Sequence, residues 1–154
     1  MLVSCPSPLV QSTLTRLREA GQRHCECVVL WLGRPNGGMA CVEEAYQPPQ
    51  TAKADMFHIP RAGMTALQAE LRRRRLMVAA QVHSHPREAF HSKADDRWAI
   101  VRHENALSLV VPHFAIETTL LNFLDHTKVY RFSASAQWIE VPRPEVERSC
   151  LRIS

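Results

Sequence analysis

Residues 77–96 have the sequence MVAAQVHSHPREAFHSKADD, and this stretch decides how the rest of the chain is interpreted. Met77 to Val82 is an apolar, β-rich run, which predicts a strand that ends in His83 and His85. Because successive side chains of a strand alternate between its two faces, histidines at i and i+2 point to the same face. The sequence therefore predicts two imidazoles side by side at the end of a strand.

The residues from Pro86 to His91 predict a loop that leads into a helix. Ser92 can cap a helix that runs from Lys93 to about Arg102. The pattern Ser92-x-x-Asp95 is that of an ordinary helix cap with an acidic first turn. The alternative is that the Ser92 hydroxyl faces a functional site, where it would stabilise the oxyanion of a tetrahedral intermediate.

The two histidines and a nearby carboxylate form a candidate metal site. Two neutral imidazoles and one carboxylate can hold Zn²⁺ and leave a fourth position open for water. Asp95 and Asp96 both follow His83 and His85 closely, but neighbouring side chains on a helix point about 100° apart, so only one can face the metal. His91 is also near, and we expect it to have a surface or core role. A metal with an open position activates water near neutral pH, so these residues predict a metal-dependent hydrolase.

Hydrolysis at such a metal also requires a general base. A carboxylate that takes a proton from water and passes it to the leaving amine would suffice. The candidates are Glu26, Glu43, Glu44 and Glu88. Glu26 stands at the start of an apolar run, so it could project into a site at the sheet edge or remain a solvated residue at a strand end.

The rest of the chain alternates between helical and strand patterns. Apolar periodicity predicts helices over 8–22 and 62–76 and strands over 26–32, 39–46, 57–60, 107–111, 129–132 and 138–141. Trp98 is expected to anchor its helix in the core. Interleaved helices and strands predict one mixed α/β domain over residues 1–141, and the charged, proline-bearing residues 142–154 are expected to form a loose C-terminal tail.

Composition limits the class of protein. The 154 residues suffice for one domain, and 45% hydrophobic with 22% charged residues is typical of a soluble globular chain. Five cysteines without paired spacing argue against a disulfide framework. No apolar run approaches the roughly 20 residues of a membrane span, and Met1 to Leu9 lacks the features of a secretory signal. We therefore expect a cytoplasmic protein without membrane contacts.

The net charge is +4, and the densest positive cluster is the run Arg72-Arg73-Arg74-Arg75. Cations suit the C-terminal end of a helix, so the run can be a solvated helix end, or alternatively a docking patch for an acidic partner. Nucleic-acid binding is not expected, because no aromatic residues interleave with the arginines and no recognition motif is present.

Taken together, these residues resemble the JAMM motif of the JAB/MPN metalloprotease family. That motif is a distant Glu, then His-x-His-Pro, then Ser-x-x-Asp. Residues 26–33, ECVVLWLG, have the shape of the family's Glu-x-x-Gly-Leu-x-x-Gly, with Val29 in place of the first glycine. This resemblance favours Glu26 as the catalytic glutamate and covers roughly Leu9 to Ala115, and residues 89–96 are similar to bacterial members.

One spacing departs from the family and bears on the carboxylate ligand. The family usually has seven residues between the second His and the Ser, whereas six separate His85 from Ser92 here. The Ser-x-x-Asp pattern favours Asp95, and the usual distance from His to Asp favours Asp96. We expect Asp95, because the helix that links Ser to Asp is stiffer than a loop. The resemblance thus implies His83, His85 and Asp95 as ligands of one Zn²⁺ per chain.

The resemblance also implies a fold and an activity. The fold would be a single MPN/JAB-like domain, a central mixed β-sheet flanked by helices as in cytidine deaminases. The activity would be that of an isopeptidase or peptidase cleaving after the C-terminal glycine of a ubiquitin-like protein. Bacterial stand-alone relatives often accompany E1-like and E2-like proteins in ubiquitin-like conjugation systems, including antiviral defence operons. Such proteins are therefore the expected partners.

Three alternatives remain at this point. The same site could process a sulfur-carrier protein with the ubiquitin-like fold. The domain could be an inactive MPN scaffold, although such scaffolds typically lose ligands and this chain keeps Glu26, His83, His85, Ser92 and Asp95. It could also be a basic nucleic-acid-binding module, whose binding would weaken strongly with added salt.

Overall fold

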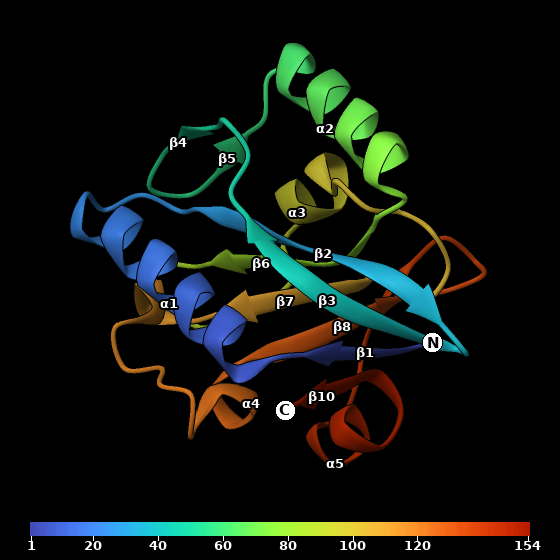
Figure 1. The fold of residues 1–154 in the computed structure, drawn as a ribbon. Helices are drawn as coiled ribbons and strands as arrows, with labels where there is room; N and C mark the ends of the chain where they lie inside the picture. Colours follow the sequence, from blue (N-terminus) through green and yellow to red (C-terminus); the bar gives the residue numbers. More distant parts are fainter.

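The computed structural model describes the backbone of residues 1–154 and every side chain except that of Trp98. Eight strands form one sheet: β1 (Leu2–Cys5), β2 (Val28–Asn36), β3 (Met39–Tyr46), β6 (Met77–Ser84), β7 (Leu107–Val111), β8 (Lys128–Phe132), β9 (Trp138–Glu140) and β10 (Leu151–Ile153). Their order across the sheet is β10-β1-β3-β2-β6-β7-β8-β9, with parallel and antiparallel neighbours, and helices flank the sheet (Figure 1). The expected mixed α/β class is confirmed.

The helices and short turns complete the chain. They are α1 (Ser7–Gln22), α2 (Arg61–Arg74), α3 (Lys93–Trp98), α4 (Phe123–His126), α5 (Arg143–Glu145), η1 (His113–Ala115) and η2 (Val146–Cys150), and β4 (Thr51–Ala52) pairs with β5 (Phe57–His58) in a second, small sheet. The predicted helices over 8–22 and 62–76 are present with ends shifted by one or two residues. Among the described helices, none is long and apolar enough to cross a bilayer.

Helix α3 is shorter than expected. It ends at Trp98 and not near Arg102, because the Arg102 guanidinium donates to the carbonyls of Asp96 (2.7 Å) and Arg97 (3.1 Å) and thereby caps the end of the helix. The core role expected for the Trp98 side chain falls outside the described residues.

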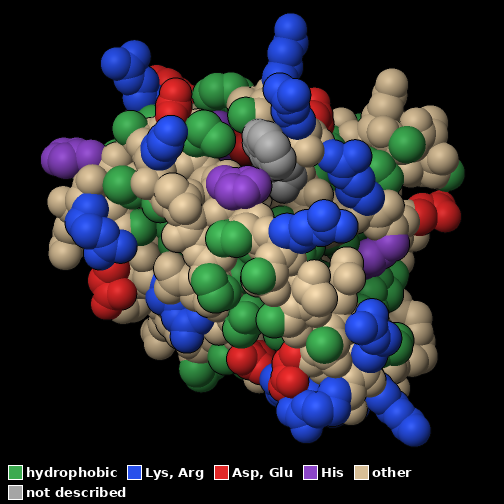
Figure 2. All heavy atoms as spheres, turned by 90° about the horizontal axis from the view of Figure 1, so that it is seen from above, with side chains coloured by type: hydrophobic (Ala, Val, Ile, Leu, Met, Phe, Trp, Pro, Cys, Tyr) green, Lys and Arg blue, Asp and Glu red, His purple; other side chains and the backbone are tan. Residues whose placement is uncertain are grey.

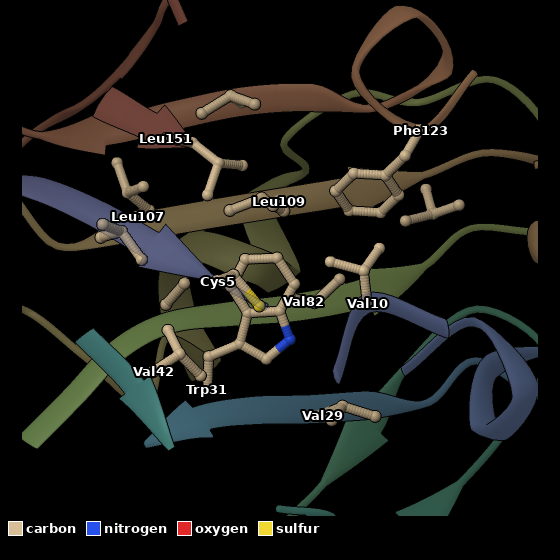
Figure 3. Packing of buried hydrophobic residues seen from close by; sticks show 14 of the residues in the cluster. Cys5, Val10, Val29, Trp31, Val42, Val82, Leu107, Leu109, Phe123 and Leu151 are labelled. Atoms are coloured by element: carbon tan, nitrogen blue, oxygen red, sulfur yellow. The ribbon is translucent and has the colours of Figure 1, made fainter. Parts of the chain in front are cut away.

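The central strand β2 is buried on both faces, which explains its continuous apolar sequence. Because side chains alternate, Val29 and Trp31 pack into one hydrophobic cluster, while Leu30 and Leu32 pack into a second cluster on the opposite face. In the first cluster Trp31 lies among residues of several strands and α1 (Figure 3), and its indole Nε1 donates to Thr13 Oγ1 at 2.9 Å. The two clusters fix β2 and β6 as a rigid support for the residues at their ends.

Residues 142–154 were expected to be a loose tail, and the structure contradicts this. Strand β10 pairs in parallel with β1, with Val3 opposite Leu151, and both side chains are fully buried. Backbone bonds continue the pairing, since Ser7 N–H donates to Ser154 O at 2.6 Å and Ser154 N–H donates to Cys5 O at 3.1 Å. Both strands are too short to show a hydrophobic period, so the sequence pattern predicted neither.

Basic side chains are distributed over the face formed near α2. Viewed from above (Figure 2), Lys and Arg side chains alternate with hydrophobic and acidic ones and do not form one continuous patch. Two arginines of the basic run are paired: Arg73 Nη2 lies 2.7 Å from Glu70 Oε1, and Arg74 Nη1 lies 2.6 Å from Glu44 Oε2.

A left-handed turn follows β7. His113, Phe114 and Ala115, which form η1, have φ values of 52°, 50° and 60°. The left-handed conformation brings Cβ close to the following carbonyl and costs about 1–2 kcal/mol per non-glycine residue. In the part of the chain that the structure describes, this is the one place where three such residues are consecutive. Neighbouring elements must therefore hold the turn in place.

Candidate metal centre

Strand β6 carries the two predicted histidines to the centre of the sheet. His83 lies within β6 between Val28 of β2 and Val110 of β7, and His85 follows the last residue of the strand. Both side chains are buried, and their ring centroids are 5.2 Å apart. The sequence prediction that the imidazoles lie side by side is thus met by the geometry.

Helix α3 brings Asp95 to these histidines through its N-terminal cap. Ser92 Oγ accepts a hydrogen bond from Asp95 N–H at 3.1 Å, and Asp95 Oδ2 accepts one from Ser92 N–H at 2.7 Å. This reciprocal capping box fixes the first turn of the helix and the carboxylate within it. The Ser92 hydroxyl therefore acts as a cap through its oxygen, which leaves its O–H to donate.

The three side chains converge in a way that suits a metal ion. One ligand atom from each of His83, His85 and Asp95 lies within 4.8 Å of the others. Nε2 of His83 is 3.1 Å from Asp95 Oδ1, and Nε2 of His85 is 3.3 Å from Asp95 Oδ2. Neighbouring ligand atoms of a tetrahedral zinc site with bonds of about 2.0–2.1 Å are roughly 3.3 Å apart.

Unsatisfied nitrogen atoms support the same interpretation. Among the described residues, neither Nδ1 nor Nε2 of the fully buried His83 has a hydrogen-bond partner, despite the short distance to Asp95. A buried polar atom without a partner is costly unless something else satisfies it. A cation bound between the two imidazoles and the carboxylate would satisfy His83 Nε2, so these residues fit a metal ion.

The charge balance of the cluster also favours a cation. Burial by itself would raise the pKa of the Asp95 carboxyl, but the imidazoles of His83 and His85 and the N–H of Ser92 outweigh burial and hold that pKa well below its usual range. Burial lowers the pKa of His85, and the carboxylates of Asp95 and Glu26 outweigh this and raise it overall. The pocket thus keeps a buried negative charge that attracts either protons or a metal.

Glu26 lies next to this cluster, just before β2. Its backbone N–H donates to Lys53 O at 2.7 Å, and its side chain is buried. Burial raises the pKa of Glu26 to about 7, with an opposing effect of His85 and further raising by Asp95 and Asp55. A carboxyl group with a pKa near neutrality can both accept and release a proton at physiological pH.

Glu26 faces two cavities. One has a volume of about 240 Å³ and is lined by Glu26, Asp55, His85, Pro86, Arg87, Glu88, Phe90 and Ser92. The other, lined in part by Glu26, Asp55, Phe57 and Asp95, measures about 10 Å³, which is near the room that one water molecule needs. The structure therefore gathers Glu26 and Ser92 on the wall of a cavity that His85 also lines.

The other candidate bases are placed differently. Glu43 Oε1 lies 2.7 Å from Arg34 Nε, and Glu44 pairs with Arg74, so both carboxylates are engaged in surface ion pairs. Glu88 lines the larger cavity but is exposed.

Asp96 turns away from the cluster. Its Oδ1 lies 3.2 Å from Nδ1 of His91, and its side chain is 58% exposed. His91 itself is buried between Tyr130 and Trp138, with ring centroids 5.0 and 5.1 Å away, and its backbone N–H donates to the Tyr130 hydroxyl. The sequence did not predict this pairing, and the only signal was the place of His91 directly before Ser92.

Comparisons with known proteins agree with the site. No protein-family model matches the chain. The chain is 35% identical over 150 residues to "Probable metalloprotease y4jG" of Sinorhizobium fredii, and the match covers 95% of this chain and 91% of that protein. The fold is similar to that of protein DSY2949 from Desulfitobacterium hafniense, with a TM-score of 0.68 and 18% identity over 99% of this chain and 93% of the other.

Proposed function

Because this chain belongs to the family of the "Probable metalloprotease y4jG" of Sinorhizobium fredii, we propose that it is a zinc-dependent peptidase of the JAB/MPN type. The observation that carries the proposal is the buried cluster of His83, His85 and Asp95 beside the cavity that Glu26 and Ser92 line. The order of these five residues along the chain is that of the JAMM motif.

The donor set of two imidazoles and one carboxylate suits zinc better than the hard cations Mg²⁺ and Ca²⁺, which prefer oxygen ligands. When bound, zinc supplies a Lewis acid that makes water nucleophilic near neutral pH. His83, His85 and Asp95 would hold the ion and leave room for water and substrate.

Glu26 acts as the general base and acid in this proposal. Its carboxylate takes a proton from the attacking water and delivers that proton to the amine that leaves as the peptide bond breaks. Burial supports this role, because it raises the pKa of Glu26 to about 7 and so makes both proton transfers accessible at neutral pH.

Ser92 stabilises the charge that develops on the carbonyl oxygen. Its Oγ already accepts the Asp95 N–H, so the hydroxyl is held in place and can donate its proton to the oxyanion.

The substrate that we propose is a ubiquitin-like protein, cleaved after its C-terminal glycine to mature a precursor or to release a conjugate. The resemblance of residues 26–33 and 83–95 to the JAMM motif supports cleavage at this position. The resemblance to JAMM proteases supports the rest: a place in a bacterial ubiquitin-like conjugation or antiviral defence system, E1-like and E2-like partners and a cytoplasmic location.

The test combines metal content with cleavage. Purified protein is analysed for zinc and then incubated with a ubiquitin-like protein that carries a C-terminal extension, beside the Glu26→Gln and His83→Ala variants. We expect about one zinc per chain, cleavage directly after the terminal glycine, and loss of cleavage with a chelator and in both variants. His24→Asn serves as the matched control, since His24 is exposed and Asn also tolerates its positive φ of 55°.

Each other outcome contradicts a defined part of the proposal. Cleavage of a sulfur-carrier precursor, and not of the ubiquitin-like protein, would contradict the proposed substrate. Zinc binding without cleavage of either substrate would contradict the proposed peptidase activity. Absence of both zinc binding and cleavage would favour the inactive scaffold.

A further inference from the structure

The left-handed turn η1 lies against the segment that carries the second histidine. Phe114 N–H donates to His85 O at 2.8 Å, and His113 N–H donates to Arg87 O at 2.9 Å. The amide of His85 in turn donates to Val111 O at 2.9 Å. Both backbone polar groups of His85 are therefore held by the chain between the end of β7 and η1.

The helical conformation of the turn allows this pairing. In an extended strand, successive amides point to opposite sides, so only every second one could reach a neighbour. In a helical turn, successive amides point the same way, and here those of His113 and Phe114 both reach the segment after β6. Their acceptors are the carbonyls of His85 and Arg87, one on each side of Pro86.

Helix α1 holds the turn from the other side. The Arg18 side chain donates from Nε to Ala115 O at 3.0 Å and from Nη2 to Thr118 O. Gly21 leaves room for Phe114, since a Cβ at position 21 would lie 2.4 Å from Phe114 Cβ. The turn is thus fixed between α1 and the strand end, which explains how three strained residues persist.

We infer that the turn His113–Ala115 positions the metal centre by fixing the backbone of His85. Hydrogen bonds from Arg18 and close packing against Gly21 hold the turn in place. Strained backbone conformations that the surrounding structure maintains are concentrated at functional sites. The inference rests on the metal centre of the proposed function, but not on its substrate. Groups that orient a metal ligand typically change metal affinity by about 10–100-fold when they are lost.

The experiment compares Arg18→Ala with Arg16→Ala. Both arginines lie on α1 and both donate to a backbone carbonyl, but Arg16 Nη1 binds Ala45 O of β3 and not the turn. Zinc affinity is measured by competition with a chelator, Co²⁺-substituted protein is examined by absorption spectroscopy, and metal-free unfolding is measured for both. We expect similar losses of stability, with metal affinity about tenfold weaker and an altered Co²⁺ spectrum only in Arg18→Ala.

A second pair keeps the test decisive if Arg18→Ala does not fold. Gly21→Ala should displace Phe114, whereas Gly63→Ala on α2 adds the same methyl group far from the turn, where its nearest neighbour is 3.3 Å away. Equal zinc affinity and equal spectra within each pair would make the turn merely structural and overturn the inference. A wild-type protein that binds zinc but cleaves nothing would contradict the proposed function alone, and one that binds no metal would overturn both.

Discussion

Nε2 of His83 lies 3.1 Å from Oδ1 of Asp95, yet the two atoms do not form a hydrogen bond of acceptable geometry. Atoms that share a proton point at one another, whereas ligands of one ion point at a common third position. The short distance without directionality fits two ligands of one metal ion, whereas Nε2 of His85 and Oδ2 of Asp95 do form a hydrogen bond at 3.3 Å. Ser92 N–H also donates to Oδ2 of this carboxylate, so its orientation does not depend on the histidines alone.

The first prediction separates Asp95 from Asp96. Asp95→Asn removes the charge but keeps an oxygen that can accept from Ser92 N–H, so the helix cap should survive while metal binding is lost. The affinity for zinc should fall by more than the roughly 10–100-fold that loss of an outer partner costs. Asp96→Asn is the matched control and should retain about one zinc per chain. Metal analysis after dialysis measures both, and the reverse result would assign the ligand role to Asp96.

The second prediction concerns removal of the metal. A ligand that binds only the folded state at 100 times its Kd stabilises it by about 2.7 kcal/mol, which corresponds to roughly 5–10 °C in Tm for a chain of this size. Thermal unfolding with excess zinc and with a chelator should differ by this amount in the wild-type protein. His83→Ala should abolish the difference, whatever its own Tm, and His24→Asn should keep it. An unchanged wild-type Tm would mean that the cluster binds no metal.

The third prediction is a pH dependence caused by Glu26. Because burial raises its pKa from 4.5 to about 7, the metal-free protein has the full stabilising contribution of the protonated group below pH 4.5 and loses it as the pH rises through 7. Glu26→Gln cannot ionise. The free energy of unfolding of this variant should therefore exceed that of the wild type by an amount that grows from near zero at pH 4.5 to about 2–3 kcal/mol above pH 7. The same change should lower the cleavage rate by at least about 100-fold.

Urea unfolding of metal-free protein at pH 4.5, 6 and 7.5 measures this effect. Glu88→Gln is the matched control, since the exposed Glu88 lines the same cavity. A pH-independent difference for Glu26→Gln would show that Glu26 is ionised in water-like surroundings and would weaken its role as the base.

Much of the fold could be predicted from local sequence. The strands over 39–46 and 107–111 have the predicted bounds, because apolar runs there are bounded by Gly and Pro. Asp95, not Asp96, lies with the histidines because the helix cap is stiff and sets its direction, as the Ser-x-x-Asp spacing indicated. The cluster of His83, His85 and Asp95 is thus encoded within one short stretch of chain.

The features that were missed depend on contacts between distant segments. The pairing of Val3 with Leu151 joins the two ends of the chain. A four-residue strand has no local sequence pattern that indicates its partner strand. The turn at Phe114 contains no glycine, so nothing local signals a left-handed conformation. The burial of Glu26 likewise results from the loop that contains Lys53 and Asp55, which is distant in sequence.

The last prediction separates the two roles of Ser92, which caps α3 and is proposed to donate to the oxyanion. Glycine is a good N-cap residue, so Ser92→Gly should lower stability by only a few tenths of a kcal/mol, whereas Ser92→Ala should cost about 1 kcal/mol. Both variants lack the hydroxyl and should lose about 100-fold or more in kcat, as other oxyanion donors do. Ser92→Thr keeps both groups and should restore cap and activity. If kcat instead followed stability across the three variants, Ser92 would be only a cap, and the oxyanion would require another donor.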